Sequence, residues 1–166
     1  KYLVIRDKGL LKEISRLTVE YAGKTKRKLS NPFLRNLLLL IVGEAIKTPI
    51  SLIPTFERVE NSFKEGRDPI LQNAPAVIIF YAKKFAPFAE INANLALYNV
   101  SLICHQHGLG SFCAGSVMHF CRREDKINKL LDIPEGHNIY GVLAIGKPKY
   151  KFKKWIERKT ADIQWM

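Results

Sequence analysis

A glycine-rich segment near the middle of the chain has the residue types that let a backbone approach a flat ligand closely. It spans residues 108–116 and reads GLGSFCAGS. Because glycine has no side chain, the backbone can come close to a planar ring, and its amide N–H groups stay free to donate hydrogen bonds. A helix that begins near Ser116 would add the positive end of its dipole. The same spacing also fits an ordinary turn that needs glycine conformations, so the segment alone leaves both interpretations open.

Other motifs that carry chemistry are missing from the sequence. It has no Gly-x-x-x-x-Gly-Lys-Ser/Thr phosphate loop, no Gly-x-Gly-x-x-Gly dinucleotide fingerprint and no Gly-x-Ser-x-Gly nucleophile elbow. The three cysteines, Cys104, Cys113 and Cys121, form no Cys-x-x-Cys pair, and the neighbouring histidines supply no second ligand pair at zinc spacing. We therefore identify no metal site and no catalytic side chain. We expect free thiols in or near the core and a cytoplasmic protein.

The charge of the chain is strongly positive and unevenly distributed. Lys and Arg number 27 against 15 Asp and Glu, which gives a formal net charge of +12. Residues 147–159 hold seven basic residues against one acidic residue, and a second basic cluster occupies residues 24–28. Such clusters suit an anionic partner, and aromatic residues that alternate with the basic ones at 150–155 could stack on bases. A non-enzymatic protein that binds nucleic acid is therefore an alternative, although no known nucleic-acid-binding motif is present.

Hydrophobic periodicity predicts strands that alternate with helices. Strands are expected at residues 2–6, 76–81 and 138–145, and helices at 10–22, 32–47, 54–64, 88–107, 116–122 and 124–131. Gly23 is expected to end the first helix, which leaves the basic cluster at 24–28 in a loop. Asn31 and Pro32 are expected to cap and open the second helix. This order excludes an all-α or an all-β protein.

The second predicted helix is apolar on almost every side between Leu37 and Val42. Such a helix is expected to be buried in a core or at a subunit contact, and on this ground we predict a homodimer. The apolar run is far shorter than the roughly 20 residues that span a membrane, so no membrane segment is expected. The length of 166 residues predicts a single domain over 1–166. Because the chain opens on a strand without an initiating Met, we expect the amino-terminal part of that domain to be missing.

Several segments resemble those of nitroreductase-family flavoproteins in their order and spacing. The sequence EINANLALYN at 90–99, followed by the glycine segment, resembles the central helix and glycine loop of the family. DIPEGH at 132–137 resembles the next turn, and APAVII at 74–79 resembles the strand before the central helix. GKPKYKFKKWIERK at 146–159, with IQW at 163–165, resembles the carboxy-terminal arm. The resemblance covers nearly the whole chain and is closest to members with an amino-terminal ferredoxin-like segment.

This resemblance implies an α+β nitroreductase-like fold, a central β-sheet flanked by helices, whose carboxy-terminal arm is exchanged with a partner subunit. It implies a homodimeric, FMN-dependent oxidoreductase that passes two electrons through flavin N5 to a small-molecule acceptor, with NAD(P)H or ferredoxin as the donor. Carried over by position, the backbone of Ala114, Gly115 and Ser116 would face the flavin ring near N5. Arg158 and Lys154 would reach the FMN phosphate, the former through its bidentate fork and the latter as a point charge.

The sequence also departs from the family pattern. Family members begin with an Arg/Ser-rich segment that grips the FMN phosphate, and this sequence starts after it. Lys147 stands where the family more often has Tyr, and Ser116 stands where many relatives have Gly or an aromatic residue. A family-like scaffold that holds no flavin is therefore a third interpretation, and the flavin absorbance of the purified protein separates it from the first.

Overall fold

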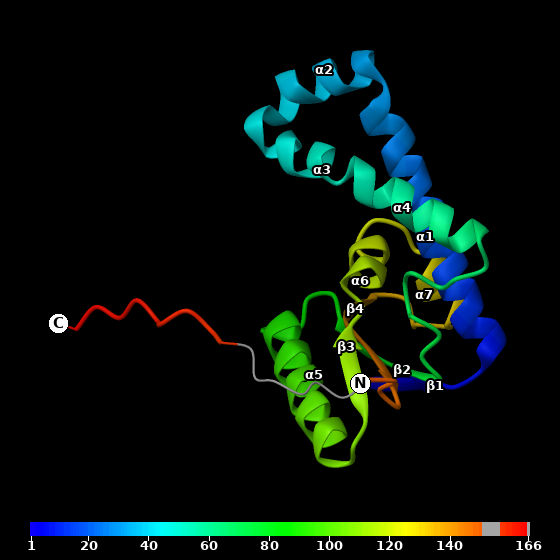
Figure 1. Ribbon diagram of the computed structural model, residues 1–166, viewed down its shortest axis with the longest axis vertical. Coiled ribbons are helices and arrows are strands. Elements are labelled where there is room, and N and C mark those ends of the chain that lie inside the picture. The colour runs from blue at the N-terminus through cyan, green and yellow to red at the C-terminus, as the bar shows by residue number, and fades with distance from the viewer. Residues whose placement is uncertain (151–156, 166) are drawn as a thin grey trace.

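A four-stranded antiparallel sheet organises the chain in the computed structural model, which describes residues 1–150 and 157–165 (Figure 1). The strands are β1 (Tyr2–Ile5), β2 (Ala76–Lys83), β3 (Gly110–Cys113) and β4 (His137–Gly146), in the spatial order β1-β2-β4-β3. β1, β2 and β4 confirm the three predicted strands. β3 was not predicted, because it lies inside the glycine segment, where a turn was expected. It pairs with the end of β4, with Gly110 opposite Gly146.

Helices cover both faces of this sheet. They are α1 (Lys8–Ser30), α2 (Pro32–Val42), α3 (Lys47–Ser51), α4 (Ile53–Lys64), α5 (Ala89–Gln106), α6 (Gly115–Cys121) and α7 (Lys126–Leu130), with a 3₁₀ turn η1 (Gly43–Ile46) before α3. Strands and helices together confirm the predicted α+β class. None of the helices in the described residues is both long and apolar enough to cross a membrane.

The main hydrophobic core lies between the sheet and α1, α6 and α7. Ile14 of α1, Val77 of β2, Val117 of α6 and Val142 of β4 are fully buried in one cluster. Because successive strand residues point to opposite faces, Gly141 faces the other way, where Leu97 of α5 lies against it. α5 therefore packs on the second face of the sheet, and Figure 1 shows it on the opposite side from α1, α6 and α7.

The first helix is longer than the sequence predicted. Gly23 does not end α1 but lies buried within it, where the carboxylate of Glu60 from α4 occupies the space that a Cβ would take. The expectation of a basic loop at 24–28 is therefore wrong, because these residues form the last turns of α1. Lys26 pairs with Glu60, and the Nζ of Lys24 lies 2.8 Å from Glu20, so this cluster is partly neutralised.

The second helix begins as predicted but is not buried in a core. The Oδ1 of Asn31 accepts hydrogen bonds from the amides of Phe33 and Leu34 at 3.0 and 3.2 Å, which confirms the expected cap. α2 ends at Gly43, whose φ of 64° lies in the left-handed region. Several of its apolar side chains, among them Phe33 and Ile41, are exposed, and Leu40 is 84% exposed. Figure 1 shows α2 and α3 at the end of the molecule farthest from the sheet.

Candidate functional site

The glycine segment forms a strand that leads directly into a helix. Gly108, with φ of 68°, ends the turn after α5, and β3 then runs antiparallel to β4. The hydroxyl of Ser111 in β3 lies 2.8 Å from the hydroxyl of Ser101 in α5, which ties the strand to that helix. α6 begins at Gly115, only two residues after β3 ends. The segment is therefore held on one side by the sheet and on the other by α5.

Ala114 anchors the junction between β3 and α6. Its amide donates to the carbonyl of Val142 at 2.9 Å, and its carbonyl accepts from the amide of Val117 at 3.1 Å. Its side chain is buried, so Ala114 offers no free amide at the surface. Gly115 and Ser116 are exposed and form the first turn of α6, where helical amides have no intrahelical acceptor. Of the three predicted ring-facing residues, two are therefore exposed and have backbone amides without an intrahelical acceptor.

Nothing in its surroundings requires residue 115 to be glycine. A Cβ added at Gly115 would meet no heavy atom within 4 Å, and its φ lies outside the left-handed region. A turn that needs a glycine conformation therefore does not explain this position. The open space at the Cβ position of Gly115 leaves room for the edge of a flat ring, so the residues present are compatible with a flavin on this side.

Of the two predicted phosphate-binding residues, Arg158 does not lie at this junction. Arg158 belongs to residues 157–165, which form no helix or strand and are exposed. Figure 1 shows this segment extending away from the sheet and from α6. Lys154 lies outside the described residues. The structure thus brings Ala114, Gly115 and Ser116 together and leaves Arg158 apart from them within one chain.

Burial disfavours the thiolate form at two of the cysteines near the junction. Cys104 and Cys121 are buried, as expected, and burial raises the pKa of Cys121 to about 12. Cys113, at the end of β3, is exposed, so the expectation of a core thiol is wrong there. Partial burial nevertheless raises the pKa of Cys113 above its ordinary value. Within the described residues, no group of three His, Cys, Asp or Glu side chains could hold a metal ion.

Sequence reasoning missed an exposed apolar stripe beside the glycine segment. Ile91, Leu95, Tyr98 and Leu102 lie on one face of α5, at intervals of three and four residues, and each is about half exposed or more. Their helical spacing was visible in the sequence, but the apolar character of the remaining faces of α5 hid which face points outward. Such a stripe marks a surface that another protein surface can cover.

Comparison with known proteins places this geometry in a family. The nitroreductase family model matches residues 1–147. The chain belongs to the nitroreductase family. Members of this family are typically FMN-dependent oxidoreductases. Among curated proteins, none matches the sequence.

Solved nitroreductase structures share the fold at low sequence identity. An FMN-bound nitroreductase from Bacteroides fragilis NCTC 9343 is 18% identical, with a TM-score of 0.66, over 100% of this chain and 75% of its own. An FMN-bound nitroreductase from Desulfitobacterium hafniense DCB-2 is 13% identical, with a TM-score of 0.62, over 99% and 75%. A variant of an FMN- and NADPH-dependent nitroreductase from sphigopyxis sp. strain HMH is 16% identical, with a TM-score of 0.60, over 99% and 78%. The predicted nitroreductase-like fold is thereby confirmed.

Proposed function

We propose that this nitroreductase-family chain is an FMN-dependent oxidoreductase that takes electrons from NAD(P)H or ferredoxin and passes them to a small-molecule acceptor. When bound, the flavin supplies two-electron transfer through its N5 position. The observation that carries the proposal is the empty space at the Cβ position of Gly115. Among the described residues, neither packing nor backbone conformation requires a glycine at this position. Membership of the nitroreductase family indicates the class of ligand for this space, which is a flavin.

In this proposal the junction between β3 and α6 orients the ring. The amides of Gly115 and Ser116 donate to the ring edge near N5, while Ala114 keeps them in place through its bond to Val142. Fixed backbone donors of this kind are already aimed before the ligand arrives, so they lose little freedom on binding. A donor at N5 also responds to the protonation of that atom, so it affects the redox potential as well as the affinity.

The phosphate is held in this proposal by Arg158 and Lys154 from the carboxy-terminal arm of the partner subunit. The exposed position of Arg158, away from Gly115 of its own chain, supports an exchange of arms. The guanidinium suits a phosphate because its planar fork donates two parallel hydrogen bonds. The flavin would then lie at the interface of a homodimer and contact both subunits.

Exposed apolar surface supports the homodimer. The stripe on α5 lies on the helix that contacts β3, so a partner that covers it would also border the glycine segment. We further propose that the dimer works in the cytoplasm, where a reducing environment keeps its three cysteines free.

The visible absorbance of the purified protein tests this function. A bound oxidised flavin that is bleached by NADH, NADPH or reduced ferredoxin under anaerobic conditions is the expected result, and the effective donor identifies the physiological class. A colourless protein that takes up no added FMN would contradict the proposal. If such a protein shifted DNA at low salt, nucleic-acid binding would replace it, although Glu20 and Glu60 already neutralise part of the basic cluster on α1.

A further inference from the structure

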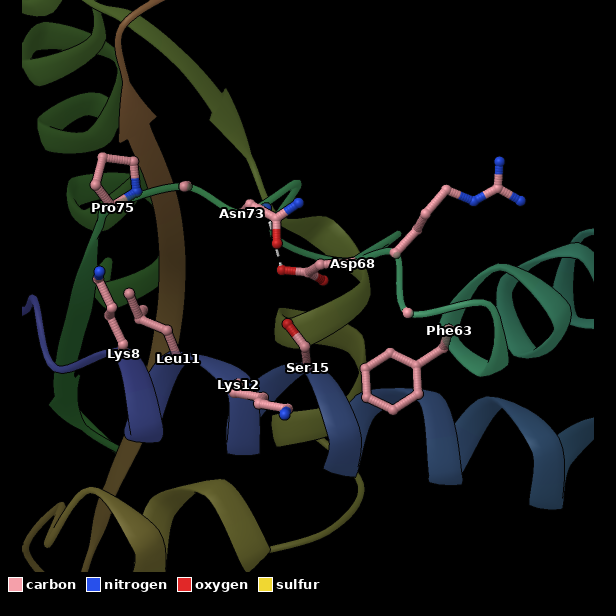
Figure 2. A pocket seen from close by; sticks show the side chains of 11 residues that line it. Lys8, Leu11, Lys12, Ser15, Phe63, Asp68, Asn73 and Pro75 are labelled. Carbon is pink, nitrogen blue, oxygen red and sulfur yellow. Dashed lines mark hydrogen bonds between the residues drawn. The ribbon is translucent and has the colours of Figure 1, made fainter.

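A cavity of about 750 Å³ lies away from the glycine segment. It opens between the first half of α1 and the linker at residues 66–75 that joins α4 to β2 (Figure 2). Pro75, at one end of the lining, directly precedes β2. We call it the α1 cavity. It is distinct from the empty space at Gly115, because no residue of the glycine segment lines it.

The α1 cavity has a basic wall. Lys8 and Lys12 line it from α1, one helical turn apart on the same face. Among the ion pairs in residues 1–150 and 157–165, none involves either lysine. The one carboxylate in the lining belongs to Asp68, which accepts hydrogen bonds from the amides of Ile70 and Leu71 at 3.0 Å. Asp68 therefore braces its own linker rather than neutralising the lysines.

A buried hydroxyl without a partner among the described residues lies on the same helix, three residues after Lys12. Ser15 is 1% exposed, and its Oγ makes no hydrogen bond. Figure 2 shows the hydroxyl directed from α1 toward the linker that carries Asp68 and Asn73. Thr18, one turn further along α1, is equally buried but donates to the carbonyl of Ile14 at 2.8 Å. Because a buried polar group without a partner is costly, the free Ser15 hydroxyl points to a polar ligand in the cavity.

We propose that the α1 cavity binds a small phosphate monoester with an apolar body. The phosphate accepts hydrogen bonds from the Ser15 hydroxyl and from Lys12, and Lys8 adds a second positive charge on a long, flexible stem. A phosphate carries close to two negative charges at neutral pH and thus matches two free lysines better than a carboxylate does. Leu11, Phe63 and Pro75 line the same cavity and offer an apolar surface to the rest of the ligand.

Heteronuclear NMR with phenyl phosphate as the probe tests this site. We expect the probe to shift the amide signals of α1 residues 8–15 and of the linker 66–75. Phenol, which lacks the phosphate, and benzoate, which carries one negative charge, are expected to bind more weakly. Shifts confined to other parts of the chain, or benzoate binding more tightly than phenyl phosphate, would overturn the proposal.

Matched variants separate the site from general electrostatic attraction. Lys12→Met is expected to weaken phenyl phosphate binding about tenfold or more, as for loss of a charge-assisted hydrogen bond. Lys129→Met removes an exposed lysine on α7 that is likewise free of described ion pairs, and it is expected to leave the affinity unchanged. Equal weakening by the two substitutions would show non-specific attraction and refute the site.

Two further variants test whether the Ser15 hydroxyl is a ligand and whether the probe binds at the flavin site instead. Ser15→Ala is expected to weaken binding severalfold while its thermal midpoint stays unchanged or rises, because the substitution removes an unpartnered hydroxyl. Unchanged affinity in Ser15→Ala would count against the hydroxyl as a ligand. Gly115→Val is expected to bind phenyl phosphate normally whether or not the protein holds flavin, and loss of binding there would place the probe at the flavin site instead.

Discussion

At the scale of single residues, Gly115 is the sharpest test of the flavin site. Its φ is ordinary, and an added Cβ would meet no atom within 4 Å, so the isolated chain tolerates a side chain there. We predict that Gly115→Val changes the free energy of unfolding by less than about 1 kcal/mol. The same substitution is expected to remove bound FMN or slow its reduction, because the branched side chain would stand where the ring edge meets the amides. Thermal midpoint and flavin content, measured on one sample, check both halves.

Gly136 supplies the reciprocal control. Its φ of 72° lies in the left-handed region, so Gly136→Val is expected to lower stability by about 1–3 kcal/mol through backbone strain. Flavin content should not change, since Gly136 lies in the turn before β4. If Gly115→Val behaved like Gly136→Val, with a lower midpoint and full flavin, position 115 would be structural.

Arg158 is the second residue whose role can be measured directly. We predict that Arg158→Ala weakens FMN binding about ten- to a hundredfold, because a charge-assisted hydrogen bond to phosphate contributes about 1.5–3 kcal/mol. Lys149→Ala is the matched control, since the Nζ of Lys149 lies 5.6 Å from the ring centroid of its neighbour Tyr150 and has no assigned phosphate role. Flavin fluorescence titration gives both dissociation constants, and equal values would remove the assignment of Arg158.

At the scale of elements, the sequence predicted those helices, strands and caps that depend on residues close to one another along the chain. The continuous apolar, β-branched run of β2 favours a strand through its own composition, and the Asn31 cap needs only the amides of Phe33 and Leu34. Gly23 and β3 depend on distant residues instead. Gly23 ends no helix because Glu60 of α4 packs over it, and the four residues of β3 become a strand because β4 pairs with them.

Ion pairs centred on Glu20 connect α1 to α7 and give stability a pH dependence. Its carboxylate lies 2.8 Å from Lys24 and 3.4 Å from Lys126, and these partners lower the pKa of Glu20 from 4.5 to about 2. Because the pKa in the folded state lies below the unfolded value, the stabilisation is present above pH 4.5 and lost as the pH falls toward 2. We predict that Glu20→Gln is less stable than the parent at neutral pH, and that the difference shrinks on acidification.

Urea unfolding from about pH 7 down to about pH 3 measures this difference. Glu57→Gln is the control, because Glu57 is exposed on α4 and joins no ion pair in the described part of the chain. Its difference from the parent should stay flat with pH. A Glu20→Gln difference that is equally flat would show that the contacts with Lys24 and Lys126 do not stabilise the fold in solution.

At the scale of the whole molecule, two helices among the described residues leave several large apolar side chains exposed. One is α5, with the stripe beside the glycine segment, and the other is α2, where Phe33 and Leu40 are exposed. The sequence predicted that α2 would be buried in a core or at a subunit contact, and the fold removes the first possibility. The sequence could not show that α5 leaves a stripe uncovered, because this depends on which one face of the helix packs against the sheet.

We predict that the protein is a dimer at micromolar concentration and that the α5 stripe lies in its interface. Leu95→Glu, at the centre of that stripe, is expected to weaken the dimer by about 3 kcal/mol or more, because it would bury an unpaired carboxylate. This corresponds to more than a hundredfold in the dissociation constant. Sedimentation should then show monomers, and bound flavin should be lost as well, because under the proposed function the phosphate-binding arm would come from the partner. Lys129→Glu makes a larger charge change on exposed α7 and should keep both dimer and flavin. A monomeric parent would reject the dimer, and a dimer unaffected by Leu95→Glu but dissociated by Leu40→Glu would move the interface to α2.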